Sequence, residues 1–554
     1  MSLRSRLILL VLLSSVLLPL ALPNELLGAA LKALGLRPDQ SFYWGDAILG
    51  LVCIAPLFYA IVEAPSFGFA SILGMIFGAV STLLASYWLM FFQNFSVWTM
   101  GGTVLGYVGY NAVLFPFLRG FSNISGRFRP FVLAAAWAVY EYFKSIGFLG
   151  YPWGLVADPA TGVLPLIQIA DVTGIWGLSF LMALGNALVA EYALNGYRLR
   201  FLRQAVFSAV LVAAALVYGV VRLATPIPSH GTASMLLVQQ NMDPWQEGVA
   251  AAESVRINAQ LTIDGVSRAK DPPDLAVWSE SSVSTPELIV VPGNRFNREK
   301  NDLVPMIQRA GVPILFGGVV EVSRAQQEYM NASVLVDGRG AILDTYGKIH
   351  PVPFAESIPF FEYPAVRRFF RDVVGLWNEW TMGKRFTIYR VPLAAGGQLA
   401  FGTPICFEDA FADVCRGFVL RGADMLVNIT NDSWSKTWSA EIQHFQVARL
   451  RAVENRRVLV RSTNGGVSGV VGPWGEIRAE MPLFQSTWGL VRVPVYESGT
   501  LTLYTRLGDW FPQALIAVLF VFLALSVALS APWADRPPTG RRTVGAPWAW
   551  RGSP

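Results

Sequence analysis

The chain has 554 residues, of which 53% are hydrophobic and only 15% are charged, and its net charge is +5. A soluble enzyme of this length carries about 25% charged residues, so the composition excludes a chain that is soluble throughout. Three cysteines are too few for a disulfide framework, so any part outside the cytoplasm does not depend on disulfide bridges.

Eight apolar stretches are long enough for transmembrane helices, which need about 20 mostly apolar residues. A signal peptide is a weaker interpretation of the first stretch, because no small-residue cleavage site closes it. We therefore expect seven spans in a membrane region over 1–225 and an eighth in a helix over 511–532, followed by a disordered tail over 533–554. The apolar stretches cover about 6–22, 47–65, 69–90, 98–118, 130–147, 172–193, 204–223 and 513–531.

Arginines in the short loops indicate the orientation, because cytoplasmic loops are enriched in Lys and Arg. They cluster before the first span, at 119–129, at 198–203 and after the last span, which all lie on one side of an eight-span chain. Both termini are therefore predicted to be cytoplasmic, with 226–510 on the extracytoplasmic side. Since topology explains the arginines, we expect no nucleic-acid partner.

Between the seventh and eighth spans, short apolar runs alternate with helical stretches, a pattern typical of an α/β layered domain. A helix is expected near its end, over 440–455. The runs expected to form buried strands are 234–238, 275–278, 314–318, 333–336, 399–402 and 425–429.

Three reactive residues, Glu280, Lys348 and Cys406, each lie at or just after such a run, and strand ends are where α/β sheets present active groups. A thiolate can attack a carbonyl while the carboxylate takes the thiol proton and the ammonium faces the oxyanion. Taken alone, each residue has a non-catalytic interpretation: Glu280 could form a salt bridge, Lys348 could be a solvated lysine, and Cys406 could be a small core residue. Their joint occurrence indicates an active site, and a helix expected over 408–420 would favour the thiolate.

The segments that carry these residues resemble the nitrilase (carbon–nitrogen hydrolase) superfamily. Residues 346–356 are similar to its Y-x-K-x-H-L-V-P-F-G-E segment and residues 404–408 to its I-C-Y-E/D segment. The resemblance covers about 232–495 and implies an α-β-β-α sandwich. Further similar segments are 428–434, the helix with His444, and 461–469.

A nitrilase-like domain between seven spans and one resembles the apolipoprotein N-acyltransferase family, as do the membrane segments 150–154 and 167–174. This resemblance implies that Glu280 is the general base, Lys348 the oxyanion stabiliser and Cys406 the nucleophile. It also implies supporting roles for Glu356, which positions Lys348, for Glu408 beside the nucleophile, for the backbone N–H of Phe407, and for Trp245.

The resemblance further implies a ping-pong acyl transfer in the bacterial inner membrane, the final step of lipoprotein maturation. A phospholipid would donate its acyl chain to Cys406, and a lipoprotein with an N-terminal diacylglyceryl-cysteine would accept it. No cofactor or metal is expected, because the three histidines are scattered along the chain. Two alternatives remain: a membrane-anchored amidase that passes its thioester to water, and a transporter or receptor without catalysis.

Aromatic residues and arginines alternate over 358–382, directly after Glu356. A helix here would bury its aromatic rings in the membrane interface while the arginines meet phosphates. The alternative is a loop packed on the domain itself.

Overall fold

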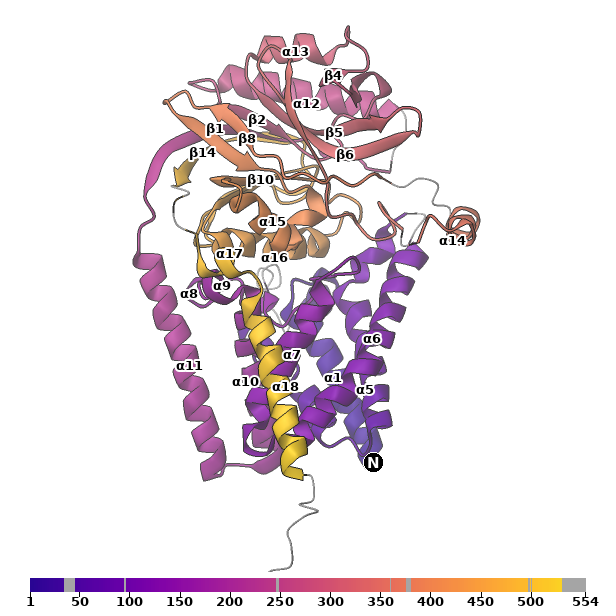
Figure 1. The fold of residues 1–554 in the computed structure, drawn as a ribbon, viewed down its shortest axis with the longest axis vertical. Coiled ribbons are helices and arrows are strands. Elements are labelled where there is room, and N and C mark those ends of the chain that lie inside the picture. The colour runs from indigo at the N-terminus through magenta and orange to yellow at the C-terminus, as the bar shows by residue number, and fades with distance from the viewer. Residues whose placement is uncertain are drawn as a thin grey trace, which may run out of the picture.

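The computed structural model describes residues 1–33, 45–93, 96–245, 249–358, 360–374, 380–496, 499 and 501–530. A bundle of long helices forms one half of the molecule and an α/β domain forms the other (Figure 1). The predicted tail, 533–554, lies outside the described residues.

Helices lie at all eight of the apolar stretches. By length and composition, α1, α5, α10 and α11 are long and apolar enough to cross a membrane. The eight positions are occupied by α1 (Leu3–Ala21), α3 with α4 (Ala47–Gly50 and Ala55–Val62), α5 (Phe67–Ala85), α6 (Ser96–Ile124), α7 (Arg129–Ser145), α10 (Ile175–Asn195), α11 (Leu199–Ala224) and α18 (Trp510–Ser530).

The second expected span is not one helix but two, because the chain turns between α3 and α4. Pro56 lies in the first turn of α4, where its missing N–H costs nothing. The backbone groups freed by the turn are satisfied by Asn186 of α10, which accepts from the Ile54 N–H at 2.7 Å and donates to the Gly50 carbonyl at 2.8 Å. A side chain from a neighbouring helix therefore makes a broken helix tolerable inside the bundle.

The α/β domain contains an eight-stranded and a six-stranded sheet, and all six predicted strand runs lie in their strands. The first sheet has the order β14-β1-β2-β5-β3-β4, with β6 and β7 continuing from β5. Its strands are β1 (Ser229–Gln239), β2 (Leu275–Trp278), β3 (Val290–Val291), β4 (Arg295–Phe296), β5 (Ile314–Ser323), β6 (Glu328–Val336), β7 (Ile342–Gly347) and β14 (Thr487–Tyr496). The second, in the order β13-β12-β11-β10-β9-β8, contains β8 (Tyr389–Pro392), β9 (Gln398–Gly402), β10 (Met425–Thr430), β11 (Val458–Thr463), β12 (Gly469–Val471) and β13 (Ile477–Glu480).

The two sheets pack face to face, and helices cover their outer faces, in the α-β-β-α order (Figure 1). Helices α12 (Val249–Arg268) and α13 (Leu303–Ala310) cover the first sheet, and α15 (Ala412–Val419) and α16 (Trp438–Asn455) cover the second. The hydroxyl of Ser462 on β11 links the sheets by donating to the carbonyls of Val238, at 3.1 Å, and Val277, at 2.9 Å.

Helix α16 lies between the second sheet and the helical bundle, and of its 18 residues only Trp438 is exposed. Phe445 and Val447 belong to the core that includes the sheets, whereas Leu450 and Val453 belong to the core of the membrane helices. The helix therefore packs against both halves of the molecule.

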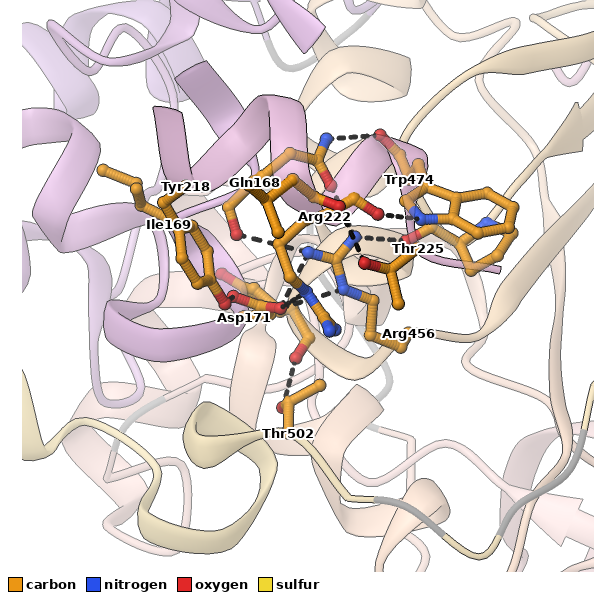
Figure 2. Close-up of polar contacts among 12 residues, drawn as sticks. Gln168, Ile169, Asp171, Tyr218, Arg222, Thr225, Arg456, Trp474 and Thr502 are labelled. Atoms are coloured by element: carbon orange, nitrogen blue, oxygen red, sulfur yellow. Dashed lines mark hydrogen bonds and ion pairs between the residues drawn. The ribbon is translucent and has the colours of Figure 1, made fainter. Parts of the chain in front are cut away.

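A buried ionic cluster also joins the two halves (Figure 2). Asp171 of α9 (Ala170–Thr173) accepts from the Tyr218 hydroxyl at 2.7 Å and from Nε of Arg222 at 3.0 Å, both in α11. The third partner of Asp171 is Arg456, which follows α16 in the left-handed conformation with φ 51°. Arg456 also donates to the side chain of Gln168 at 2.5 Å, so one guanidinium connects the end of α16 to the bundle of apolar helices, the membrane half of the molecule.

The two arginine-rich loops meet at the end of the bundle that is far from the α/β domain. Gln204 donates to the carbonyl of Arg127 at 2.7 Å, and Arg200 donates to the carbonyl of Gly126. Helix α1 begins and α18 ends at the same end of the bundle (Figure 1).

The aromatic segment contains a much shorter helix than 358–382 would allow. Helix α14 (Pro364–Phe369) is followed by one π-helical turn over Phe370–Val374, and the predicted position Trp377 lies outside the described residues. Phe360 and Tyr363 are exposed. The ring of Phe369 packs edge-to-face on Trp98 of α6, with ring centroids 6.2 Å apart. The segment thus protrudes beside the top of α6 (Figure 1).

Candidate active site

Strand ends bring the three predicted reactive residues to one place. Glu280 follows β2 by two residues, and Lys348 comes directly after β7. Cys406 begins a 3-10 turn, η6 (Cys406–Ala410), after β9. Because Ile405 pairs with Ile429 near the end of β10, the nucleophile turn lies at the carboxyl end of the second sheet.

Two carboxylates surround the Lys348 ammonium. Its Nζ lies 2.9 Å from Glu356 and 3.5 Å from Oε1 of Glu280, and the side chain of Lys348 is 1% exposed. Asn331 of β6 joins the two carboxylates by donating to Oε1 of Glu280 at 2.8 Å and of Glu356 at 3.0 Å. Glu280 is also held from the second sheet, because the backbone N–H of Asn431 donates to its Oε2 at 3.0 Å.

The backbone at Cys406 is in the left-handed conformation. Cys406 has φ 52°, a conformation that costs most residues about 1 kcal/mol or more and occurs at functional sites. Asn428 stabilises the turn from β10, since its side-chain amide donates to the carbonyls of Pro404 at 3.0 Å and Cys406 at 3.4 Å.

The thiol of Cys406 is held in its neutral form. Burial and the negative charge of Glu280 raise its pKa well above the usual value, and the nearby Lys348 offsets only part of this. For Lys348 itself, burial lowers the pKa, but Glu356 and Glu280 outweigh burial, so the pKa is raised and the ammonium is retained. The site therefore pairs a lysine ammonium with a neutral thiol.

The helix expected over 408–420 is present as α15, but it begins six residues after Cys406 and not at the thiol. Residues Cys406–Ala410 form only the 3-10 turn, and α15 begins at Ala412 after a break at Phe411. Glu408 lies within that turn, so a carboxylate rather than a long helix accompanies the thiol.

Glu408 joins the nucleophile turn to the lysine segment. Its carboxylate accepts from the backbone N–H groups of Ile405 at 2.7 Å, Ile349 at 2.7 Å and His350 at 2.9 Å, and from the Tyr346 hydroxyl. Burial raises the pKa of Glu408 to about 7, although these donors oppose the shift. The segments on either side of Lys348 and Cys406 are therefore fixed to one another.

Phe407 and Trp245 lie beside this centre in different surroundings. The ring of Phe407 stacks on Trp153 of the membrane half, with ring centroids 5.4 Å apart and an angle of 11°. Trp245 donates from Nε1 to the Trp434 carbonyl at 3.0 Å and contacts Phe92. The structure thus places Trp245 next to the loop after β10.

Two residues of the site were not predicted from the sequence. Asn331 is a polar residue directly before the buried run of β6, and Asp409 is an acid next to Glu408, so each had a visible signal. His444 and Arg461 were noted only as parts of similar segments, yet both are buried close to the nucleophile turn. Within the part of the chain that the structure describes, no group of three or more His, Cys, Asp or Glu residues could hold a metal ion.

Comparison with known proteins gives matches to both halves. Residues 28–188 match the apolipoprotein N-acyltransferase N-terminal domain, and residues 243–497 match the carbon–nitrogen hydrolase family. The chain is 36% identical to apolipoprotein N-acyltransferase 2 of Treponema denticola, over 92% of this chain and 96% of that one. It is 35% identical to apolipoprotein N-acyltransferase 2 of Treponema pallidum, over 93% and 94% of the two chains, and 30% identical to apolipoprotein N-acyltransferase of Borreliella burgdorferi, over 92% and 93%.

Proposed function

Because the chain belongs to the apolipoprotein N-acyltransferase family, we propose that it moves a fatty acyl chain from a phospholipid to a lipoprotein through a thioester on Cys406. The acceptor is the N-terminal amine of a diacylglyceryl-cysteine. The convergence of Glu280, Lys348 and Cys406 is the observation that carries this proposal.

In the first half of the reaction, Glu280 takes the proton of the Cys406 thiol, and the sulfur attacks the ester carbonyl of the phospholipid. The raised pKa of the thiol supports the need for this base. The Lys348 ammonium and the backbone N–H of Phe407 stabilise the oxyanion. Collapse breaks the ester bond, and the lysophospholipid leaves with the proton held by Glu280.

In the second half, the amine of the lipoprotein attacks the thioester while Glu280 takes a proton from the attacking nitrogen. The carbon–sulfur bond breaks, the amide forms, and the proton returns to Cys406. One carboxylate thus serves both halves of a ping-pong reaction. Hydrogen bonds from Asn331 and the Asn431 N–H keep that carboxylate in place between its two uses.

The supporting residues have distinct proposed roles. Glu356 positions the Lys348 ammonium, to which it is paired at 2.9 Å. Glu408 fixes the segment of Lys348 against the nucleophile turn through its backbone hydrogen bonds. Trp245 and Trp434 pack edge-to-face at the loop after β10 and form an aromatic surface beside the site.

For the placement in the inner membrane, we propose that 1–225 contributes seven spans, that 511–532 contributes one, and that 226–510 is extracytoplasmic. The meeting of the arginine-rich loops at the end of the bundle far from the α/β domain supports this orientation. Helix α14 then lies at the extracytoplasmic surface of the inner membrane, with Phe369 and its arginines toward lipid.

The test is to incubate the purified protein in detergent with a phospholipid that carries a radiolabelled acyl chain. We expect an acyl adduct that hydroxylamine removes, and we expect none in Cys406→Ala. Cys415→Ala is the matched control, because Cys415 is a buried cysteine of α15, and it should retain the adduct.

A synthetic peptide with an N-terminal diacylglyceryl-cysteine should then discharge the adduct, and the same peptide with an acetylated amine should not. If the adduct is lost to water at the same rate with either peptide, the protein is a hydrolase and the proposal fails.

A further inference from the structure

Four charged side chains form a closed ring beneath the nucleophile turn. His444 of α16 lies between two carboxylates, with Nε2 2.7 Å from Asp409 and Nδ1 2.7 Å from Asp432. Arg461 of β11 bridges the same two carboxylates, with Nε 3.1 Å from Asp409 and Nη2 3.4 Å from Asp432. Asp409, His444 and Arg461 are buried, and the side chain of Asp432 is 7% exposed. Two cations and two anions alternate, so the ring has no net charge.

Geometry fixes the protonation state of His444. An ionised carboxylate only accepts hydrogen bonds, and a neutral imidazole has a single N–H. With both aspartates ionised, contacts from both ring nitrogens to carboxylate oxygens require the imidazolium, whose Nδ1 also lies 3.4 Å from Nη2 of Arg461. Burial opposes the charge, but Asp432 and Asp409 outweigh it and raise the pKa of His444 to about 10.

Two further groups face the imidazolium. Burial and the charge of Asp432 raise the pKa of Glu441, one turn earlier in α16, well above its usual value, which favours the neutral acid. From the membrane half, the indole ring of Trp153 lies 5.5 Å from the His444 ring. The two aspartates are therefore the anions that hold the proton on His444.

The ring connects the nucleophile with the general base. Asp409 belongs to the same 3-10 turn as Cys406. Asp432 directly follows Asn431, whose backbone N–H binds Glu280. His444 lies between these two segments, so a change in the length or charge of its side chain alters the position of the thiol relative to its base.

We propose that His444 is a positioning residue that holds the Cys406 turn and the Glu280-binding loop in register as a permanent imidazolium between Asp409 and Asp432. The role in catalysis rests on the proposed function of Cys406 and Glu280, but the imidazolium itself does not. Two experiments separate these claims.

The first experiment needs no substrate. The protein has three histidines, so the full chain labelled with nitrogen-15 histidine gives few NMR signals. We expect one histidine to remain doubly protonated at pH 8, and the same signal to be missing from His444→Gln. Neutral imidazole signals from all three histidines at pH 8 would overturn the proposal, whether or not the protein transfers acyl chains.

The second experiment measures turnover and the alkylation of Cys406 by iodoacetamide. In His444→Gln we expect kcat to fall roughly a hundredfold, as for misplacement by about 1 Å, with little change in KM for the phospholipid. His444→Gln combined with Asp409→Asn removes one cation and one anion, so it should recover about tenfold of the lost kcat. His230→Gln is the control, because His230 is exposed at the start of β1.

If the double variant is as slow as the single variant, charge balance is not the role of His444 and the proposal is wrong. Should His444→Gln not fold, which its apparent melting temperature in detergent would reveal, the NMR result on the wild-type chain still decides. Wild-type protein that lacks acyl transfer but shows the imidazolium would refute the proposed function and leave the ring intact.

Discussion

Arg456 and Asp171 form a buried ion pair between the α/β domain and the helical bundle, with Nη2 of the arginine 2.7 Å from Oδ2 of the aspartate. Neither side chain is more than 4% exposed. Asp171 also binds Arg222, so one carboxylate compensates two guanidinium groups. A partner removed from such a buried pair leaves an uncompensated charge, which costs more than the pair contributes.

We therefore expect Asp171→Asn to destabilise the protein by about 3–5 kcal/mol. The measurement is the apparent melting temperature in detergent, followed by intrinsic tryptophan fluorescence. Arg492→Gln is the matched control, because the pair of Arg492 with Asp271 is exposed and contributes little. Equal melting temperatures for Asp171→Asn and Arg492→Gln would show that the cluster does not join the halves.

Glu280→Gln should abolish acyl transfer and yet make the thiol more acidic. The charge of Glu280 raises the pKa of Cys406, so its removal lowers that pKa and moves iodoacetamide alkylation to lower pH. Lys348→Met should shift alkylation the other way, since the ammonium lowers the thiol pKa. The rate of alkylation against pH checks both, and shifts in the same direction would contradict this electrostatic account.

Asn331 should be essential to the paired carboxylates although it cannot take part in proton transfer. Asn331→Asp would place a third carboxylate beside Glu280 and Glu356 in a buried site with one ammonium. We expect the kcat of Asn331→Asp to fall by at least about a hundredfold. The kcat of Asn331→Leu should fall less, because this variant removes two hydrogen bonds without adding charge. Steady-state transfer to the diacylated peptide gives both values. An aspartate variant more active than the leucine variant would rule out this explanation.

The stability of the folded protein should fall at high pH because of His444. Burial lowers the pKa of His444, but Asp432 and Asp409 outweigh it and raise the pKa to about 10 in the folded state, from the usual 6.5 of the unfolded chain. The stabilisation is therefore fully present below pH 6.5 and is lost as pH rises through about 10. Melting temperatures of wild type and His444→Gln, measured from pH 6 to 10, should converge at the alkaline end. A constant difference across this range would mean that His444 does not titrate as the ring requires.

The reactive residues and their acidic neighbours Glu356 and Glu408 were predictable from the sequence, whereas the contacts of Asn331 and His444 were not. Glu280, Lys348 and Cys406 follow apolar runs, and parallel strands bring such ends together. Asn331 and His444 lie inside a strand and a helix, where sequence gives no sign of what they face. Their partners come from other segments, so only the tertiary structure reveals the contacts.

The helices show the same limit. Hydropathy located every long apolar helix, because about 20 apolar residues are a strong signal. It did not reveal that the second span breaks between α3 and α4, since Asn186 of a distant helix makes that break tolerable. For the aromatic segment, the sequence predicted a longer helix than the structure has. Alternating aromatic residues and arginines indicate a surface that contacts lipid, but they do not determine the length of a helix.

The position of α16 has a practical consequence for the production of fragments. A truncated chain that contains only the α/β domain would expose Leu450 and Val453, which pack against the membrane helices, and it would leave Arg456 without Asp171. An exposed apolar helix face promotes aggregation. Crystallisation or screening of an isolated soluble domain would therefore require polar substitutions on that face, and detergent-solubilised full-length protein is the more suitable material.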